Sequence, residues 1–237
     1  MNITQRSLEI INAANSLGIT LRLLGGNAVA ILSYPTHPKL ERVPNDIDLI
    51  GYGRESSRIM KLMTSIAEPD KRFNALHGQS RLRFIDGELK VKIDIFLDIF
   101  RESHILPIGK RLRLYSPTVP PSDLLMTKLQ IWAITEKDLK DIAALLLRLN
   151  LGESDSRETI SLKRIVELTS SDWGLYKTSL INLGKTLDYV RGIGVNGIEE
   201  KISIIVSRIE SSSKSLRWRL RSIIGERIKW YEEPEET

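Results

Sequence analysis

The chain has 237 residues, of which 41% are hydrophobic and 27% charged, a balance typical of a folded globular protein with one large domain or one domain plus a helical appendage. It contains no cysteine, which excludes disulfides, thiolate zinc sites, iron–sulfur clusters and thiol nucleophiles. Its net charge of +5 comes entirely from residues 1–150, which carry 21 basic and 16 acidic residues against 14 of each in the remainder. This distribution favours a polyanionic partner, although an ordinary soluble surface would explain the same charge.

The sequence gives no sign of a membrane protein or of a histidine metal site. No apolar stretch approaches the roughly 20 residues that a spanning helix needs, and the N-terminus is too polar for a signal peptide. The three histidines are widely spaced. We therefore expect a cytoplasmic protein without a membrane partner.

The first 70 residues predict alternating helices and strands. Apolar residues at helical spacing predict a helix over 3–17 that Gly18 ends. A short buried strand over 21–26 finishes in two glycines. The next expected elements are a helix over 27–34, a strand over 43–53 and an amphipathic helix over 54–68.

Residues 81–100 give the clearest local pattern. Two alternating runs flank Asp86-Gly87, the pair favoured in a two-residue hairpin turn. Such a turn would place basic residues of one strand opposite basic residues of the other, which is destabilising. A bound polyanion would relieve the repulsion, so we predict a cationic wall, with a solvated sheet face as the alternative. The wall would consist of Arg81, Arg83, Lys90 and Lys92.

Helices dominate the second half of the chain. A short strand is expected over 111–116, followed by a helix over 120–134 with Ser122 as its N-cap. The remaining expected elements are a helix over 137–150, a linker over 152–158 and further helices beyond it.

This order of elements predicts an α+β protein. Residues 1–150 would form a mixed β-sheet flanked by helices, and residues 151–237 a C-terminal helical bundle. In the C-terminal part, basic residues surround Trp218 and Trp230. Interleaved cations and aromatic rings can bind single-stranded RNA, although such a strip is also typical of a solvated helix face.

Three aspartates are candidates for a metal site. Asp46 and Asp48 are two residues apart in a strand, so their side chains leave on the same face, where their repulsion is costly unless a cation bridges them. Asp94 lies in a second strand. Together they could hold one or two Mg²⁺ (or Mn²⁺) ions with substrate phosphates as further ligands. A solvated turn is the alternative, and Asp98 would replace Asp94 if a bulge shifts the strand.

A glycine pair is the second candidate feature. Gly25 and Gly26 lie between a strand and a helix that starts near Asn27. This arrangement can bring backbone N–H groups and the positive end of a helix to a phosphate group. The same pair is also typical of an ordinary tight turn.

These features, in this order, resemble a known family. LLGGNAVAIL, NDIDLIGYG and VKIDIFLDI are similar to the three motifs of the nucleotidyltransferase (DNA polymerase β-like) superfamily. PSDLLMTKLQIWAI followed by KDLKDIAALL resembles the lysine and Asp-x-x-Asp motifs of its AbiEii-like group, which includes toxins of toxin–antitoxin systems. The resemblance covers about residues 20–150. It implies a nucleotidyltransferase-like fold and Mg²⁺-dependent transfer of a nucleoside monophosphate from an NTP to an acceptor hydroxyl.

The resemblance also implies roles for individual residues. Asp46, Asp48 and Asp94 would be catalytic and bind metal, with Asp94 helping to activate the acceptor hydroxyl. The nucleotide would be bound by Gly25, Gly26, Asn27, Lys128 and Asp141, and the other catalytic residues would be Lys128 and Asp138.

Some features depart from the family or allow another interpretation. Lys137 stands where the AbiEii-like group often has arginine, and the segment between the glycine pair and Asp46 leaves room for a further loop. Lys128 could be a solvated helix residue, and Asp138 and Asp141 a helix-capping and surface pair.

The acceptor is the least determined part of the hypothesis. RNA, such as a tRNA 3′ end, is favoured by the basic charge, and a toxin would imply a cognate antitoxin as a protein partner. The alternatives are transfer to a small molecule or a protein, and an inactive module that only binds nucleotide or RNA.

Overall fold

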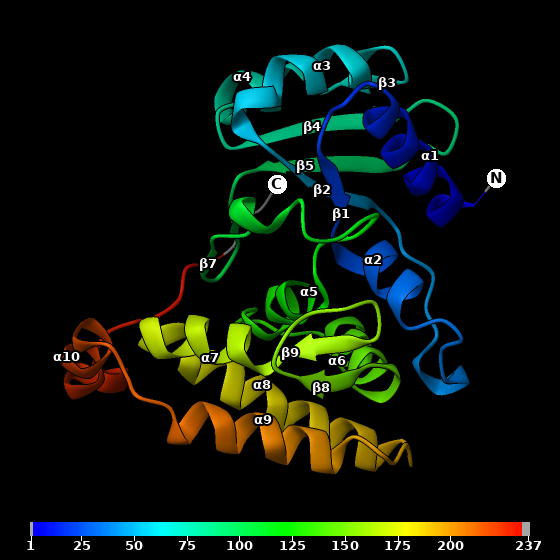
Figure 1. The fold of residues 1–237 in the computed structure, drawn as a ribbon. Helices are drawn as coiled ribbons and strands as arrows, with labels where there is room; N and C mark the ends of the chain where they lie inside the picture. Colours follow the sequence, from blue (N-terminus) through cyan, green and yellow to red (C-terminus); the bar gives the residue numbers. More distant parts are fainter. Residues whose placement is uncertain (1, 234–237) are drawn as a thin grey trace. The chain divides into compact units, whose positions relative to one another are not determined.

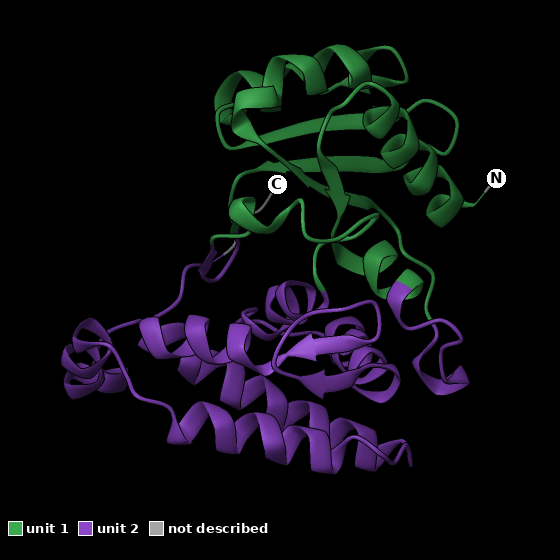
Figure 2. Cartoon of the chain, in the orientation of Figure 1, with its two compact units in different colours: residues 1–31, 42–100, 107–120 green, residues 32–41, 101–106, 121–237 purple. Residues whose placement is uncertain are grey.

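The computed structural model describes residues 2–233, which divide into two compact units (Figure 2). The first unit comprises the chain up to residue 31, residues 42–100 and residues 107–120. The second comprises residues 32–41, residues 101–106 and the chain from residue 121 onward. Among the described residues, no helix is both long enough and apolar enough to cross a bilayer.

A five-stranded mixed sheet forms the centre of the first unit (Figure 1). Its strand order is β1-β2-β5-β4-β3, with β2 and β5 parallel and the other neighbours antiparallel. The strands are β1 (Leu21–Leu23), β2 (Ile47–Gly51), β3 (Ala67–Pro69), β4 (Arg81–Asp86) and β5 (Lys92–Leu97).

One face of this sheet is the hydrophobic core of the first unit. Alternate residues of β2 and β5, such as Leu49 and Ile93, are fully buried, as expected for a strand with one apolar face. Ile59 and Arg6 reach this face from two helices that cover it. The helices of the unit are α1 (Ile3–Ser16), α2 (Gly25–Leu32, ending at the boundary of the second unit), α3 (Ser56–Thr64) and α4 (Lys71–His77).

The structure confirms the hairpin but corrects its turn. The Asp86 carboxylate accepts hydrogen bonds from the backbone N–H groups of Glu88 (3.0 Å) and Leu89 (2.8 Å), and its carbonyl accepts one from Lys90. These bonds stabilise a loop over residues 87–90 instead of the two-residue turn, because an Asp side chain can satisfy the donors of a wider turn. The predicted strand register is therefore wrong by four residues.

The corrected register changes the expected cationic wall. Arg83 lies opposite Asp94, not opposite Lys90, which is in the loop. Arg81 lies opposite Phe96. The expected repulsion between directly opposed like charges is therefore absent from this hairpin.

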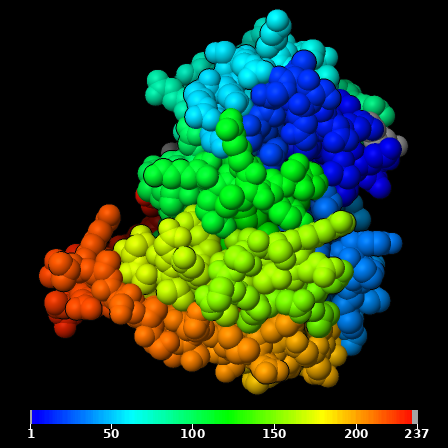
Figure 3. Space-filling model, in the orientation of Figure 1, coloured from blue at the N-terminus to red at the C-terminus, as the bar shows by residue number. Residues whose placement is uncertain are grey.

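The second unit consists mainly of helices. Residues 121–150, which the sequence analysis assigned to the first domain, pack here, because α5 contacts α6, α7 and α8. Side chains of α7 and α9 adjoin in the space-filling view (Figure 3). The helices are α5 (Pro121–Leu129), α6 (Glu136–Arg148), α7 (Leu162–Ser171), α8 (Trp173–Gly192), α9 (Glu199–Ser211) and α10 (Leu216–Ile224).

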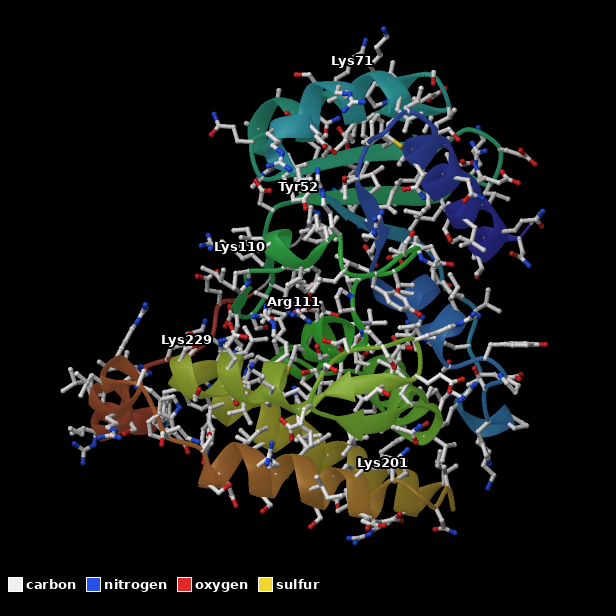
Figure 4. All side chains as sticks on the ribbon, viewed as in Figure 1. Tyr52, Lys71, Lys110, Arg111, Lys201 and Lys229 are labelled. Atoms are coloured by element: carbon white, nitrogen blue, oxygen red, sulfur yellow. The ribbon has the colours of Figure 1, made fainter. Side chains whose placement is uncertain are left out.

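Charged side chains complete the ends of two of these helices. Lys201 of α9, labelled in Figure 4, donates to the carbonyl groups of Leu146 (2.8 Å) and Leu149 (2.7 Å) at the end of α6. Ser122 is not the N-cap of α5. It lies within the helix, and the Asp155 carboxylate accepts hydrogen bonds from both its backbone N–H (2.8 Å) and its hydroxyl (2.6 Å).

Two further expectations were wrong. Residues 111–116 form turns instead of a strand, and residues 117–119 take the place beside β1 through hydrogen bonds to Leu23. The expected linker over 152–158 instead connects the short parallel strands β8 (Asn150–Gly152) and β9 (Thr159–Ser161), which lie within the second unit.

The C-terminal helix presents its aliphatic residues outward. Leu216, Leu220 and Ile223 are 77%, 67% and 76% exposed, so these aliphatic side chains of α10 are not buried within the described chain. Trp230 instead packs beside the rings of Trp132, with centroids 5.0 Å apart. The two tryptophans of the basic strip therefore lie in different environments, since Trp218 contacts Tyr176.

We predict that Asp86→Ala destabilises the protein by about 2–3 kcal/mol, because it removes the carboxylate that accepts from two backbone N–H groups and leaves Arg6 without its buried partner. Urea unfolding followed by circular dichroism measures the change. Glu88→Ala is the matched control, since it removes an exposed carboxylate from the same loop and should change stability by less than about 0.5 kcal/mol. Equal losses in the two variants would contradict this role for Asp86.

Candidate nucleotide site

Three charged residues form a row across the sheet of the first unit. Asp48 on β2 is in register with Asp94 on β5, which is in register with Arg83 on β4. These positions alternate with Leu49 and Ile93, so the row lies on the other face of the sheet, where Ile50 and Phe96 are also buried. The strand pairing therefore brings two of the three predicted carboxylates side by side.

The third carboxylate, Asp46, lies immediately before β2. Its carbonyl accepts a hydrogen bond from the Asn27 side chain (2.7 Å), and the Thr4 hydroxyl donates to the same amide (3.0 Å). Asn27 is fully buried. Its amide therefore fixes the start of β2 relative to α2, a structural role that the sequence analysis did not predict.

The two glycines make room for charged side chains. A Cβ atom at Gly25 would collide with the Asp48 carboxylate, and Gly25 has a φ of +57°, which disfavours any other residue. A Cβ atom at Gly26 would lie 2.5 Å from Nη2 of Arg42. Helix α2 thus begins at the glycine pair itself, with an acid against one glycine and a guanidinium against the other.

Arg42 is a residue that sequence reasoning missed. The segment between the glycine pair and Asp46 was expected to hold a loop of unknown path, and no role was assigned to its basic residues. A basic residue shortly before the Asp-x-Asp sequence was the available signal. In the structure its guanidinium group packs against Gly26 in the first turn of α2.

Asp94 is held by three cations. Its carboxylate is 1% exposed and contacts Nη2 of Arg81 (2.8 Å), Nε of Arg83 (2.8 Å) and Nζ of Lys92 (3.3 Å). Burial alone would raise the pKa of this carboxyl, but the hydrogen bond from Arg83 and the charges of Arg81 and Lys92 outweigh it and lower the pKa below its ordinary value. Asp94 is therefore ionised throughout the neutral range.

These contacts bear on the expected metal site. Across residues 2–233 no three or more acidic or histidine side chains gather as metal ligands, and the metal role of the three aspartates stays a prediction. Both oxygens of Asp94 already accept from guanidinium groups. Asp46 and Asp48 are partly exposed, and Mg²⁺ is often held by one or two carboxylates together with substrate phosphates.

Asp98, the alternative third acid, lies away from this pair along the sheet. It follows β5, and its backbone N–H donates to Gly51 at the end of β2. A Cβ atom at Gly53 would lie 2.7 Å from its carboxylate. Asp46 is at the opposite end of β2, so the alignment of Asp48 with Asp94 favours Asp94 over Asp98 as the neighbour of the acid pair.

The remaining predicted residues lie in the second unit. The Lys128 ammonium group contacts carboxylate oxygens of Asp138 (3.1 Å) and Asp141 (3.0 Å), which ties α5 to α6. Burial opposes the charge of Lys128, but the two carboxylates outweigh burial and raise its pKa. Asp138 is also the capping-box residue at the start of α6, opposite Thr135. These contacts give Lys128 and Asp138 a structural role, and their predicted contacts with nucleotide stay predictions.

Comparison with known proteins finds only solved structures of low sequence identity. No protein-family model matches the chain, and no curated protein matches it. Among solved structures it is similar to the lincomycin-bound lincosamide antibiotic adenylyltransferase LnuA, with 18% identity and a TM-score of 0.45 over 61% of this chain and 98% of that one. It is also similar to an antigenic nucleotidyltransferase-like protein from Paracoccidioides brasiliensis, with 14% identity and a TM-score of 0.45 over 90% of this chain and 94% of that one.

We predict that Gly25→Ala destabilises the protein by at least about 2 kcal/mol, because alanine is strained at this positive φ and its Cβ displaces the Asp48 carboxylate. Thermal and urea unfolding measure the loss. Gly87→Ala is the control, because a Cβ there meets no atom within 4 Å. A Gly25→Ala variant as stable as Gly87→Ala would show that Asp48 does not need this space.

We predict that Asp138→Asn lowers the free energy of unfolding at pH 7 by about 1–2 kcal/mol, since it removes a charge paired with buried Lys128. Burial raises the pKa of Asp138. The Lys128 charge and the hydrogen bonds from Thr135 and Lys128 lower the pKa by more than burial raises it, so the folded-state pKa lies below the ordinary value. The stabilisation is therefore complete above about pH 4 and is lost as the pH falls through the lower folded-state value.

Urea unfolding of wild type and Asp138→Asn at pH 7 and pH 3 tests this dependence. The difference between the two proteins should shrink at pH 3. A constant difference would mean that the effect comes from the lost cap geometry and not from the charge.

Proposed function

We propose that the first unit transfers a nucleoside monophosphate from an NTP to an acceptor hydroxyl, with pyrophosphate as the leaving group. The observation that carries the proposal is the contact between Gly25, at the start of α2, and the carboxylate of Asp48. Gly25 and Gly26 form the first turn of α2, and the Asp48 carboxylate packs directly against Gly25. A phosphate-binding helix start and two carboxylates for a divalent cation are the two parts that this chemistry needs at one place.

The residues of the chain would share the work of binding and orientation. Backbone N–H groups at the start of α2 would bind the triphosphate, and Arg42 beside Gly26 would contribute positive charge. Asp46 and Asp48 would hold Mg²⁺ or Mn²⁺ together with phosphate oxygens, and such an ion neutralises charge on the reacting phosphate. Asn27 would keep the two parts in place through its hydrogen bond to the Asp46 carbonyl.

For the acceptor we propose the 3′ hydroxyl of an RNA such as tRNA. The net charge of +5, all of it from residues 1–150, favours a polyanion. The sequence resemblance to the AbiEii-like group supports the further proposal of a toxin with a cognate antitoxin. Transfer to a small molecule or to a protein is the alternative that the same chemistry allows.

Labelling identifies the nucleotide and the acceptor together. The protein is incubated with Mg²⁺, each α-³²P-labelled NTP in turn and total tRNA, and the products are separated on a denaturing gel. Label in the tRNA band supports the proposed acceptor, and label on protein would replace it by protein nucleotidylation. If no label appears in either, thin-layer analysis of the low-molecular-weight fraction tests a small acceptor, and unchanged NTP there would contradict an enzyme.

We predict that Asp46→Asn and Asp48→Asn each lower the transfer rate at least about 100-fold, because each removes a carboxylate that would hold the divalent cation. Initial rates with the labelled NTP measure the loss. Glu68→Gln is the matched control, since this exposed acid on β3 belongs to the same sheet but lies outside the row of Asp48. A rate that falls as much in Glu68→Gln would contradict a specific role for the pair.

A further inference from the structure

Asp94 contacts more cations than are required to neutralise its single negative charge. One guanidinium group neutralises one carboxylate, yet three cations contact Asp94 within 3.3 Å. The cluster therefore has spare positive charge on the polar face of the sheet.

The three cations are exposed to different degrees. The Arg83 side chain is 8% exposed, stacks on Phe73 with its guanidinium carbon 3.8 Å from the ring centroid, and is held by both oxygens of Asp94. The Arg81 and Lys92 side chains are 24% and 36% exposed. Arg83 is thus a fixed internal partner, and the other two can meet a ligand.

Arg81 also has an unused donor. Its Nη2 donates to Asp94, and its guanidinium carbon lies 4.4 Å from the ring centroid of Phe96. Its Nε is buried and has no hydrogen-bond partner among the described residues. A buried donor without an acceptor is rare in a folded protein, and a ligand oxygen is one explanation for it.

We propose that Arg81, with Lys92, binds the phosphate groups of the nucleotide. Asp94 is then not a metal ligand but a positioning residue, which holds the guanidinium groups of Arg81 and Arg83 in place. The proposal rests on the proposed function for the identity of the ligand. A guanidinium group presents paired donors that match phosphate oxygens, and stacking on an aromatic ring fixes its plane. The position beside Asp48 places this charge next to the acid pair.

The test uses inorganic tripolyphosphate in EDTA, so that any affinity is independent of metal. Isothermal titration calorimetry of the full chain at low salt measures binding. We expect wild type to bind and Arg81→Gln to bind at least about 10-fold more weakly, which is the usual effect of losing one charge-assisted contact. Arg72→Gln is the matched control, because it removes an exposed arginine from α4 in the same unit, and it should change the affinity less than twofold.

A charge-neutral double variant tests the role of Asp94. Arg83→Gln combined with Asp94→Asn removes the buried pair together, so the net charge is unchanged and neither charge is left buried without a partner. We expect tripolyphosphate affinity to fall at least about 10-fold, because Arg81 is no longer held. Mn²⁺ affinity, measured by electron paramagnetic resonance, should stay within about twofold of wild type, whereas Asp48→Asn should lose it.

Several results would overturn the inference. Wild type that does not bind tripolyphosphate, or equal weakening in Arg81→Gln and Arg72→Gln, would exclude a specific phosphate site. A double variant that binds tripolyphosphate like wild type, or that loses Mn²⁺ as Asp48→Asn does, would contradict the positioning role. Nucleotidyl transfer without tripolyphosphate binding would support the proposed function and contradict the phosphate site. Tripolyphosphate binding without transfer would support the phosphate site and contradict the proposed function.

Discussion

The polar face of the sheet depends on how the charge of Asp94 is neutralised. The parallel pairing of β2 with β5 places Asp94 beside Asp48, and two adjacent carboxylates repel each other. The β4–β5 register resolves this by placing Arg83 opposite Asp94. The shorter turn favoured by Asp86-Gly87 would instead have paired Arg83 with Lys90, away from Asp94. The hydrogen bonds of the Asp86 carboxylate to the loop, and its ion pair with Arg6 of α1, therefore determine the electrostatics of the opposite face.

The glycine pair imposes the second constraint. In a phosphate-binding turn, glycines usually let the backbone approach the ligand. Here their missing side chains also admit the Asp48 carboxylate and the Arg42 guanidinium to the first turn of α2. The absence of Cβ atoms thus has two effects. It leaves the backbone N–H groups of this turn accessible to a phosphate, and it lets the two charged side chains lie beside them. This explains why the two motifs need each other although Asp46 comes 20 positions after Gly26 in the sequence.

Sequence patterns predicted the local elements well and the long-range pairings poorly. The helix over 3–17, the strand before the glycine pair, the hairpin and the α+β class all follow from periodicity and turn residues, and the structure confirms them. The hairpin register was wrong because it depends on the Asp86 side chain and on Arg6, 80 residues away. The residues near Lys128 were assigned to the first domain because the expected linker over 152–158 follows them. Their packing against α7 and α8 depends on residues beyond 160, which no local pattern contains.

The predicted third acid shows why a motif position alone does not define chemistry. A carboxylate holds a metal ion through a lone pair on one of its oxygens, and cations already paired with that oxygen compete with the metal ion. Asp94 occupies the expected place beside Asp48, but Arg81 and Arg83 engage both of its oxygens. The positive charge near a bound triphosphate would then come partly from fixed guanidinium groups and less from metal ions. Because these groups are already oriented by Asp94 and by the Phe73 and Phe96 rings, they would need little reorganisation when the nucleotide binds.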